Sequence, residues 1–227
     1  MSLIAANLQA VKTRIDAALQ AAIGAPRRSV TLVAVSKTQP AVNIRSAFAA
    51  GQRVFGENYV QEALAKREAL ADLEIEWHFI GPIQSNKAKL IAQHFDWVHG
   101  VERLKVAEIF SRNRLAGQPP LKVCVQVNVS GEGSKSGVSP DAAAELCRQV
   151  ALLPQLHLRG LMTIIENTPD PLAQRAQFRM LRELAARITA CGIALDTLSM
   201  GMTQDFEIAI AEGATMVRIG TAIFGSR

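Results

Sequence analysis

Short apolar segments alternate with longer amphipathic ones along most of this chain, and this alternation limits the folds open to it. Eight runs have the length and β-branched character of buried strands, and they lie at 30–36, 53–55, 76–80, 97–99, 123–129, 158–163, 197–200 and 216–219. The stretches between them predict helices at 40–50, 57–71, 86–93, 103–115, 140–152, 171–191 and 205–212. Eight strands that alternate with helices fit a TIM-type (β/α)8 barrel of the α/β class better than a doubly wound open sheet, which stays the alternative.

One more helix precedes the first strand. Apolar residues recur at helical spacing from Ile4 to Leu19 and predict an amphipathic helix over 3–23. No linker or change in composition divides the chain, and α/β barrels of similar length form one unit. We therefore expect a single barrel domain over 1–227, with residues 1–25 packed on the barrel as an extra helix.

The basic residues do not form a pattern typical of nucleic-acid binding. The formal net charge is +5, but Lys and Arg are spread along the chain and the aromatic residues are scattered. Nucleic-acid binders concentrate basic residues with aromatics between them. A solvated surface that attracts a small anionic ligand is the better interpretation, and we expect no nucleic-acid partner.

The cysteines and the apolar stretches indicate the compartment. Cys124, Cys147 and Cys191 are widely spaced and form no C-x-x-C pair, which argues against a zinc site or a disulfide framework and fits a reducing compartment. No stretch approaches the roughly 20 apolar residues of a membrane span, and the N-terminus lacks a signal-peptide pattern. The sequence predicts a cytoplasmic protein without a metal or a membrane partner, and we expect a monomer.

Barrel enzymes build their sites at the C-terminal ends of the strands, so the residues that finish each apolar run are the candidates. Lys37 follows the first run. Burial of its stem would lower the pKa of its amine, as Schiff-base formation with an aldehyde requires; the alternative is a lysine that extends to solvent. Asn58 follows the second run and offers an amide at the barrel mouth, where Glu57 could also begin a helix. His78 lies within the third run and is interpreted as a packed barrel histidine.

The last two runs predict a phosphate site. Gly201 and Thr203 follow one of them, and Gly220 and Thr221 follow the other. Glycine amides with hydroxyl neighbours suit a phosphate dianion, and the loops after strands seven and eight often hold one in these barrels. Arg218 alternates with apolar neighbours and should point into the barrel; a buried ion pair with Asp205 or Glu207 is the competing explanation.

The glycine-rich loop at 130–137 resembles a nucleotide-binding loop only superficially. A Walker A motif needs glycine directly before its lysine and another five residues earlier, whereas this chain has Ser134 and Val129 at those places. We reject a nucleoside-triphosphate site. The loop is expected to be a cationic cover of the barrel mouth, in which Lys135 is either a second amine for an aldehyde or a surface lysine.

Six motifs carry a resemblance to a known family: AVSKT at 34–38, FGENY at 55–59, WHFIG at 77–81, SKSG at 134–137, LSMGM at 198–202 and VRIGTAIFG at 217–225. Together they resemble the pyridoxal phosphate homeostasis protein family, which is similar to the barrel domain of alanine racemase standing alone. The resemblance implies a pyridoxal 5′-phosphate cofactor held as a Schiff base on Lys37.

The resemblance also gives roles to the other candidates. The residues that it places around the phosphate are Ser199, Gly201, Gly220 and Thr221. It places Arg218 at the pyridine nitrogen and Asn58 near the 3-hydroxyl of the ring. Thr203 stands where the family is expected to have serine, so a hydroxyl is kept.

These roles predict cofactor homeostasis and delivery rather than robust turnover. Arg218 can only donate, so it favours an unprotonated ring, which is a poor electron sink; alanine racemase has the same pairing, so Arg218 alone does not decide. Racemases and decarboxylases that resemble this barrel add a β-rich domain with the opposing acid–base group, and we expect none here; Tyr59 is expected to be a packing residue. The partners would be the cofactor and, transiently, apo-enzymes. Two alternatives stay open: an amino-acid racemase, and a class I aldolase-like enzyme that uses Lys37 on a sugar phosphate.

Overall fold

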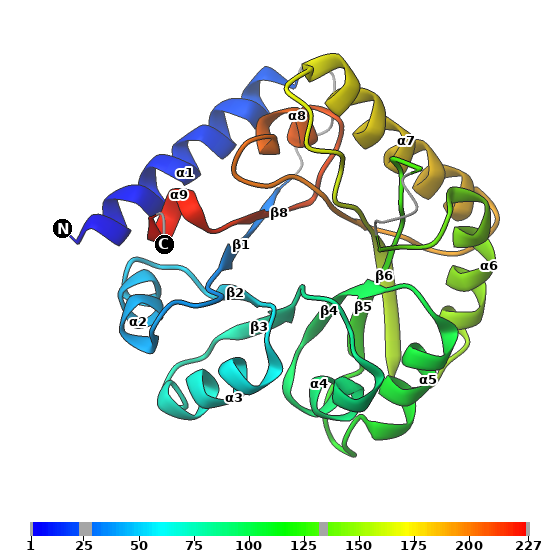
Figure 1. Cartoon of the computed structure of the whole chain (residues 1–227), viewed down its shortest axis with the longest axis horizontal. Helices are drawn as coiled ribbons and strands as arrows, with labels where there is room; N and C mark the ends of the chain where they lie inside the picture. The colour runs from blue at the N-terminus through cyan, green and yellow to red at the C-terminus, as the bar shows by residue number, and fades with distance from the viewer. Residues whose placement is uncertain (1, 23–28, 132–135, 226–227) are drawn as a thin grey trace.

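The computed structural model describes residues 2–22, 29–131 and 136–225, and its centre is a closed barrel of eight strands (Figure 1). Each strand pairs in parallel with the next, and the eighth pairs with the first. The strands are β1 Thr31–Val35, β2 Val54–Glu57, β3 Glu76–Phe79, β4 Trp97–Val101, β5 Leu121–Gln126, β6 Leu156–Met162, β7 Thr197–Ser199 and β8 Met216–Ile219. The predicted (β/α)8 barrel is confirmed, and the open sheet is excluded.

Helices surround the barrel and connect its strands (Figure 1). They are α1 Leu3–Ala21, α2 Ala41–Ala49, α3 Val60–Ala69, α4 Ala88–His94, α5 Leu104–Asn113, α6 Pro140–Ala151, α7 Pro171–Ala190, α8 Phe206–Ala211 and α9 Thr221–Phe224, with a 3₁₀ turn at Ser85–Lys87. α3 begins three residues later than the predicted 57–71, because Glu57 completes β2 and is fully buried. The short α9 was not among the predicted helices.

The helices begin where the sequence provides caps. The hydroxyl of Ser139 accepts a hydrogen bond from the amide of Ala142, and Pro140 occupies the first turn of α6. Asp170 caps α7 in the same way, again directly before a proline. Proline suits this position because the first amides of a helix have no intrahelical acceptor.

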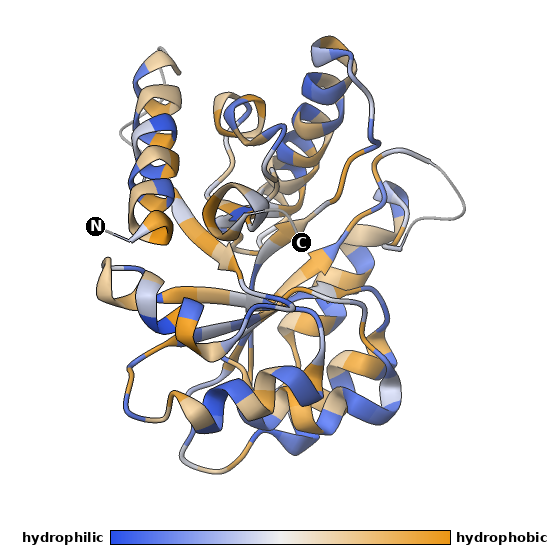
Figure 2. Ribbon diagram, turned by 60° about the vertical axis from the view of Figure 1, so that its left-hand side comes forward, coloured by the Kyte–Doolittle hydropathy of each residue, from blue (hydrophilic) through white to orange (hydrophobic). Residues whose placement is uncertain are grey.

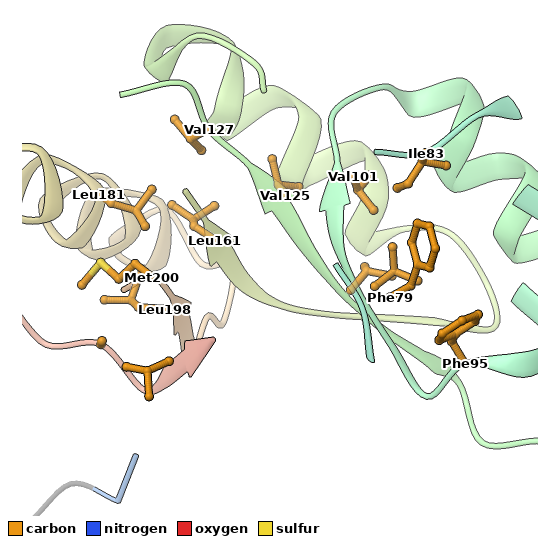
Figure 3. Packing of buried hydrophobic residues seen from close by; sticks show 14 of the residues in the cluster. Phe79, Ile83, Phe95, Val101, Val125, Val127, Leu161, Leu181, Leu198 and Met200 are labelled. Atoms are coloured by element: carbon orange, nitrogen blue, oxygen red, sulfur yellow. The ribbon is translucent and has the colours of Figure 1, made fainter. Parts of the chain in front are cut away.

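The main hydrophobic core lies between the strands and the surrounding helices. In Figure 2 the strands are largely hydrophobic, whereas the helices carry both polar and apolar residues. Figure 3 shows Leu161 of β6 beside Leu181 of α7, both fully buried. In the same layer the rings of Phe79 and Phe95 pack edge to face with their centroids 5.2 Å apart. Each such side chain contributes about 1.5–3 kcal/mol by leaving water.

The interior of the barrel is unusually polar. Its apolar part is a small cluster of Val33, Trp97, Cys124, Met162 and Met216. Two histidines, a serine and an arginine are buried with it, namely His78, His99, Ser199 and Arg218. Barrel interiors are normally filled by layers of branched apolar side chains, so these buried polar groups call for an explanation in terms of their hydrogen bonds.

The first helix connects the two ends of the described chain. α1 packs against α8 and α9, and Leu8, Val11 and Ile15 are its buried residues. The side chain of Asn7 donates a hydrogen bond to the carbonyl of Ile223 in α9 at 3.1 Å. Figure 1 shows α1 and α9 side by side.

Neither a membrane-spanning helix nor a metal-ligand cluster is found in the described ranges. None of their helices combines the length and apolarity that crossing a bilayer requires. In the same ranges, His, Cys, Asp and Glu form no cluster suited to a metal ion.

Candidate functional site

A cavity of about 190 Å³ opens at the C-terminal ends of the strands. Its lining residues belong to or follow six strands, namely β1, β2, β3, β6, β7 and β8, and include part of α9; they are Val35, Lys37, Gln39, Asn58, Ile80, Ile164, Met202, Thr203, Arg218, Gly220, Thr221, Phe224 and Gly225. Ile164 and Met202 are 42% and 39% exposed, so the cavity opens on the surface. Five of the seven predicted site residues thus meet in one place.

A larger hollow, of about 1070 Å³, lies at the opposite end of the barrel. It is lined by residues that begin strands, such as Glu76 and Trp97. Its charged groups largely neutralise each other, because Lys122 pairs with Glu76 and Arg159 pairs with Asp196. Lys37, Arg218 and Gly220, which follow or finish strands as predicted, line the smaller cavity, which we take as the candidate site.

Lys37 lies in a tight turn directly after β1. The amide of Gln39 donates to the carbonyl of Ser36 at 3.0 Å, which closes a four-residue turn with Lys37 at its second position. Thr38 then adopts a φ of +64°. A β-branched residue with positive φ is strained by roughly 1–3 kcal/mol, and such strain persists only where neighbouring contacts maintain it.

A buried charged cluster holds this turn from behind. The ammonium of Lys66 donates to the carbonyl of Ser36 at 2.7 Å and to Glu57 Oε1 at 2.7 Å, and it also binds Glu62. The Ser36 hydroxyl donates to the same Glu57 oxygen, and the amide of Thr38 donates to Glu62. Burial raises the pKa of Glu57, while Lys66 and Ser36 oppose that rise. The sequence analysis did not identify this support, since Lys66 and Glu62 read as ordinary polar helix residues.

Asn58 lines the cavity and carries an unused acceptor. Its Oδ1 is buried, with no hydrogen-bond partner in the described structure. Gly81 fixes the local backbone, because a Cβ at that position would lie 2.4 Å from the carbonyl oxygen of Asn58. A buried acceptor without a partner is costly unless a ligand or water completes it.

Arg218 points into the barrel as predicted and is 4% exposed. Its Nη1 donates to Ser199 Oγ at 2.7 Å, and its Nη2 donates to the carbonyl of Thr163 at 2.9 Å. Burial lowers the pKa of Arg218 to about 10, although nearby Asp205 opposes this shift. Over the described ranges, neither Asp205 nor any other carboxylate lies within ion-pair distance of Arg218.

The competing ion pair therefore does not form. Asp205 instead accepts a hydrogen bond from the amide of Met202. Glu207 binds Arg14 of α1 at 2.5 Å. Since a guanidinium carries five N–H donors, Arg218 has capacity left for a group in the cavity.

The residues predicted to hold a phosphate separate into two groups. Gly220 and Thr221 line the cavity, where Gly220 precedes the first turn of α9. Ser199 and Gly201 are not among the lining residues. The Ser199 hydroxyl is fully buried between Arg218 and His99, and Gly201, with φ +96°, packs on α8. Their contact with a phosphate stays a prediction.

The hydroxyls that line the cavity are those of Thr203 and Thr221. Thr203 lies four residues after β7, at the position where the family resemblance called for serine. Tyr59, expected to pack, is 53% exposed, which corrects that expectation. Ser134 and Lys135 lie outside the described residues.

His78 is part of a hydrogen-bonded chain that the sequence analysis did not anticipate. Its Nε2 lies 2.8 Å from Glu76 Oε1, and its Nδ1 lies 2.9 Å from His99 Nε2. His99 Nδ1 in turn lies 2.7 Å from Ser199 Oγ. Burial lowers the pKa of both histidines, that of His99 well below its ordinary value. His78 is thus a barrel histidine, as expected, but one in direct hydrogen-bonded continuity with the site.

The fold and the site place this chain among the barrels of the alanine racemase class. The family model described as "Alanine racemase, N-terminal domain" matches residues 6–227. The alanine racemase of Corynebacterium glutamicum has a similar fold, with a TM-score of 0.72, 18% identity and coverage of 99% of this chain and 61% of that chain. The likeness at this identity concerns the fold alone.

Closer relatives specify the family. A pyridoxal phosphate homeostasis protein of Pseudomonas aeruginosa is 58% identical over 227 residues, which cover 100% of this chain and 97% of that protein. One from Escherichia coli K12 is 48% identical over 234 residues, with 100% and 98% covered. The chain belongs to the pyridoxal phosphate homeostasis protein family. PipY of Synechococcus elongatus, solved with PLP bound, is similar with a TM-score of 0.86, 40% identity and coverage of 98% and 100%.

Proposed function

We propose that this protein binds pyridoxal 5′-phosphate in the cavity at the barrel mouth, holds it as a Schiff base on Lys37, and serves intracellular cofactor homeostasis without robust turnover. The observation that carries the proposal is the meeting of Lys37, Asn58, Arg218, Gly220 and Thr221 around one cavity. The relatives named for pyridoxal phosphate homeostasis and the PLP-bound PipY support it.

The residues present fit this cofactor. The orphaned Asn58 Oδ1 is an acceptor suited to the 3-hydroxyl of the ring. Arg218 retains N–H groups for the pyridine nitrogen, and the amide of Gly220 with the hydroxyls of Thr203 and Thr221 suits a phosphate. When bound, the cofactor supplies an aldehyde and an electron-withdrawing ring.

The surroundings favour holding the cofactor over turning it over. Arg218 can only donate, so it would hold a pyridine nitrogen in its unprotonated form, in which the ring would withdraw electrons weakly. The cavity opens on the surface at Ile164 and Met202, which suits exchange of the cofactor with solvent and transient transfer to apo-enzymes. In this arrangement Lys37 acts as a reversible anchor.

The test is the visible absorbance of purified protein titrated with pyridoxal phosphate, followed by borohydride reduction and peptide mapping. We expect a coloured complex and a reduced pyridoxyl adduct on Lys37, both absent in Lys37→Ala. Lys89→Ala, which changes an exposed lysine, should behave as the wild type. A colourless protein, or an adduct that remains in Lys37→Ala, would contradict the proposal.

The two alternatives have their own readouts. Exchange of the α-proton of amino acids in deuterated buffer, at a rate that depends on Lys37, would indicate a racemase. A borohydride-trapped sugar phosphate on Lys37, with no pyridoxyl adduct, would indicate an aldolase-like enzyme. We expect no α-proton exchange above the rate given by free pyridoxal phosphate, and no trapped sugar phosphate.

A further inference from the structure

A continuous series of hydrogen bonds crosses the interior of the barrel from the N-terminal ends of the strands to the candidate site. Glu76 is the first residue of β3 and lines the hollow at the N-terminal ends of the strands. The chain then runs through His78 of β3, His99 of β4 and Ser199 of β7 to Arg218 of β8. Its four links measure 2.8, 2.9, 2.7 and 2.7 Å.

The positions of the protons in this chain follow from its two ends. The Glu76 carboxylate can only accept, so His78 must donate from Nε2. A neutral His78 then accepts at Nδ1 from His99 Nε2–H. A neutral His99 accepts at Nδ1 from the Ser199 hydroxyl. The Ser199 oxygen is left to accept from Arg218, which can only donate.

Both histidines are neutral for reasons of environment. Each is fully buried. Toward His78 face Glu76, Asp96 and Lys122, and its pKa is lowered by burial despite the two carboxylates. Toward His99 face His78 and Arg218, which lower its pKa in addition to burial.

We propose that Glu76, at the opposite end of the barrel from the cavity, is a positioning residue for Arg218 and acts through the fixed donor direction of His78, His99 and Ser199. Arg218 has no carboxylate partner within ion-pair distance among the described residues, so this chain is its polar link to a negative charge. Hydrogen bonds aligned in one direction in a low-dielectric interior polarise one another. The guanidinium is thereby held with its remaining N–H groups toward the cavity. That this orientation serves a bound cofactor rests on the function proposed above.

The first test uses cofactor-free protein and NMR of ¹⁵N-labelled histidine and arginine side chains. The wild type should show His78 and His99 each as one Nε2–H tautomer, and separate, slowly exchanging Nη signals for Arg218. Glu76→Gln keeps the shape of the side chain, but its amide can donate as well as accept. Because the amide can present a donor to His78 Nε2, we expect a second tautomer in the spectrum, with broadened Arg218 signals.

The matched control is Glu108→Gln. Glu108 also forms an ion pair, and its side chain is 36% exposed, as is that of Glu76. Glu108 is not part of the hydrogen-bonded series from Glu76 to Arg218, so its replacement should leave the tautomers of both histidines unchanged. A single Nε2–H tautomer and sharp Arg218 signals in Glu76→Gln would overturn the proposal.

The second test measures the dissociation constant for pyridoxal phosphate. Glu76→Gln should raise it about fivefold, at the low end of typical coupling between distant sites, and shift the visible absorbance band, whereas Glu108→Gln should not. An unchanged constant and band, despite altered tautomers, would overturn the link between the chain and the site. If the wild type binds no pyridoxal phosphate, the proposed function fails, and the cofactor-free measurement decides on Glu76 by itself.

Discussion

Among single residues, the buried Glu57 has a particular consequence for the turn that bears Lys37. Its carboxylate is fully buried and accepts from both Ser36 and Lys66. Lys66 also holds the Ser36 carbonyl, so one ammonium pairs with the buried charge through Oε1 and fixes the strained turn at the same time, while Glu57 Oε2 has no hydrogen-bond partner in the described structure. The conformation of the turn that bears Lys37 thus depends on a residue of α3.

Replacing Lys66 by methionine should strongly destabilise the protein. Removing one partner of a buried pair leaves an uncompensated charge, which costs about 3–5 kcal/mol. With Lys66 gone, the pKa of Glu57 rises further. When the pKa of Glu57 is higher in the folded than in the unfolded state, the free energy of unfolding falls as the pH rises from the unfolded to the folded pKa. The destabilisation should therefore be larger at pH 7 than at pH 5. Urea unfolding at the two pH values measures this.

The control for this change is Arg148→Met. Arg148 and Glu145 form an exposed pair on α6, and such pairs contribute at most about 1 kcal/mol. A Lys66→Met variant that loses no more stability than Arg148→Met would contradict the importance given to the buried cluster.

At the scale of elements, the contact between β6 and β7 depends on a glycine without a Cβ. A Cβ on Gly160 would lie 1.8 Å from the carbonyl oxygen of Thr197, which is the first residue of β7. The backbone of one strand must move before any side chain fits. No loop or cap in the sequence marks this glycine, which lies inside an apolar run.

Gly160→Ala should lower the free energy of unfolding by about 3 kcal/mol or more, because the clash is with backbone. Gly192→Ala is the comparison: Gly192 has φ +91° but open space around it, so this change should cost only about 1 kcal/mol for conformation. Thermal and urea unfolding of the two variants give the difference. Equal losses of unfolding free energy in the two variants would contradict this expectation, because they would mean that the backbones of β6 and β7 move apart at little cost.

Features set by local sequence could be predicted from the sequence, whereas features set by contacts between distant segments could not. Local patterns predicted the eight strands, because buried parallel strands read as short apolar runs, and motif residues such as Lys37 and Arg218 predicted the cavity. Contacts between distant segments left no local signal. Lys66 binds the carbonyl of Ser36, 30 positions earlier, and His99 bonds to Ser199, 100 positions later, so the roles of Lys66 and His99 emerged only when the chain was folded.

At the scale of the whole molecule, α1 and α9 connect the start of the chain to the site. Asn7 donates to the carbonyl of Ile223, and α9 carries Thr221 at the cavity. Asn7→Ala should cost about 1 kcal/mol of stability for the lost hydrogen bond and should weaken pyridoxal phosphate binding by loosening α9. Asn113→Ala, which breaks a bond to Ile109 within α5, should affect stability alone. Equal affinity of both variants would contradict a role for α1 in binding.

The two neutral histidines also give the molecule a pH dependence. Their folded pKa values lie below the unfolded value of about 6.5. Below this pH the unfolded chain therefore binds more protons than the folded protein. The free energy of unfolding should fall as the pH decreases below about 6.5, by up to roughly 1.4 kcal/mol per pH unit for each histidine. Urea unfolding between pH 6.5 and 5 measures the slope.

The slope should persist when the two other histidines are replaced. His157 is exposed. His94 is half-buried, and its pKa is lowered by that burial and by nearby Arg67. A double variant His94→Gln, His157→Gln should keep most of the dependence. A flat profile in that variant would assign the effect to His94 and not to the interior pair.

The closure of the barrel between its first and last strands has one more consequence. Thr31 lies opposite Met216, and Ala34 lies opposite Ile219, so Lys37 and Gly220 flank the same seam although they are far apart in the sequence. A ligand that is joined covalently on one side and held through its phosphate on the other would act as a staple across that seam. Amide hydrogen exchange in these two strands should then slow on loading, and it should slow more than in β4 and β5.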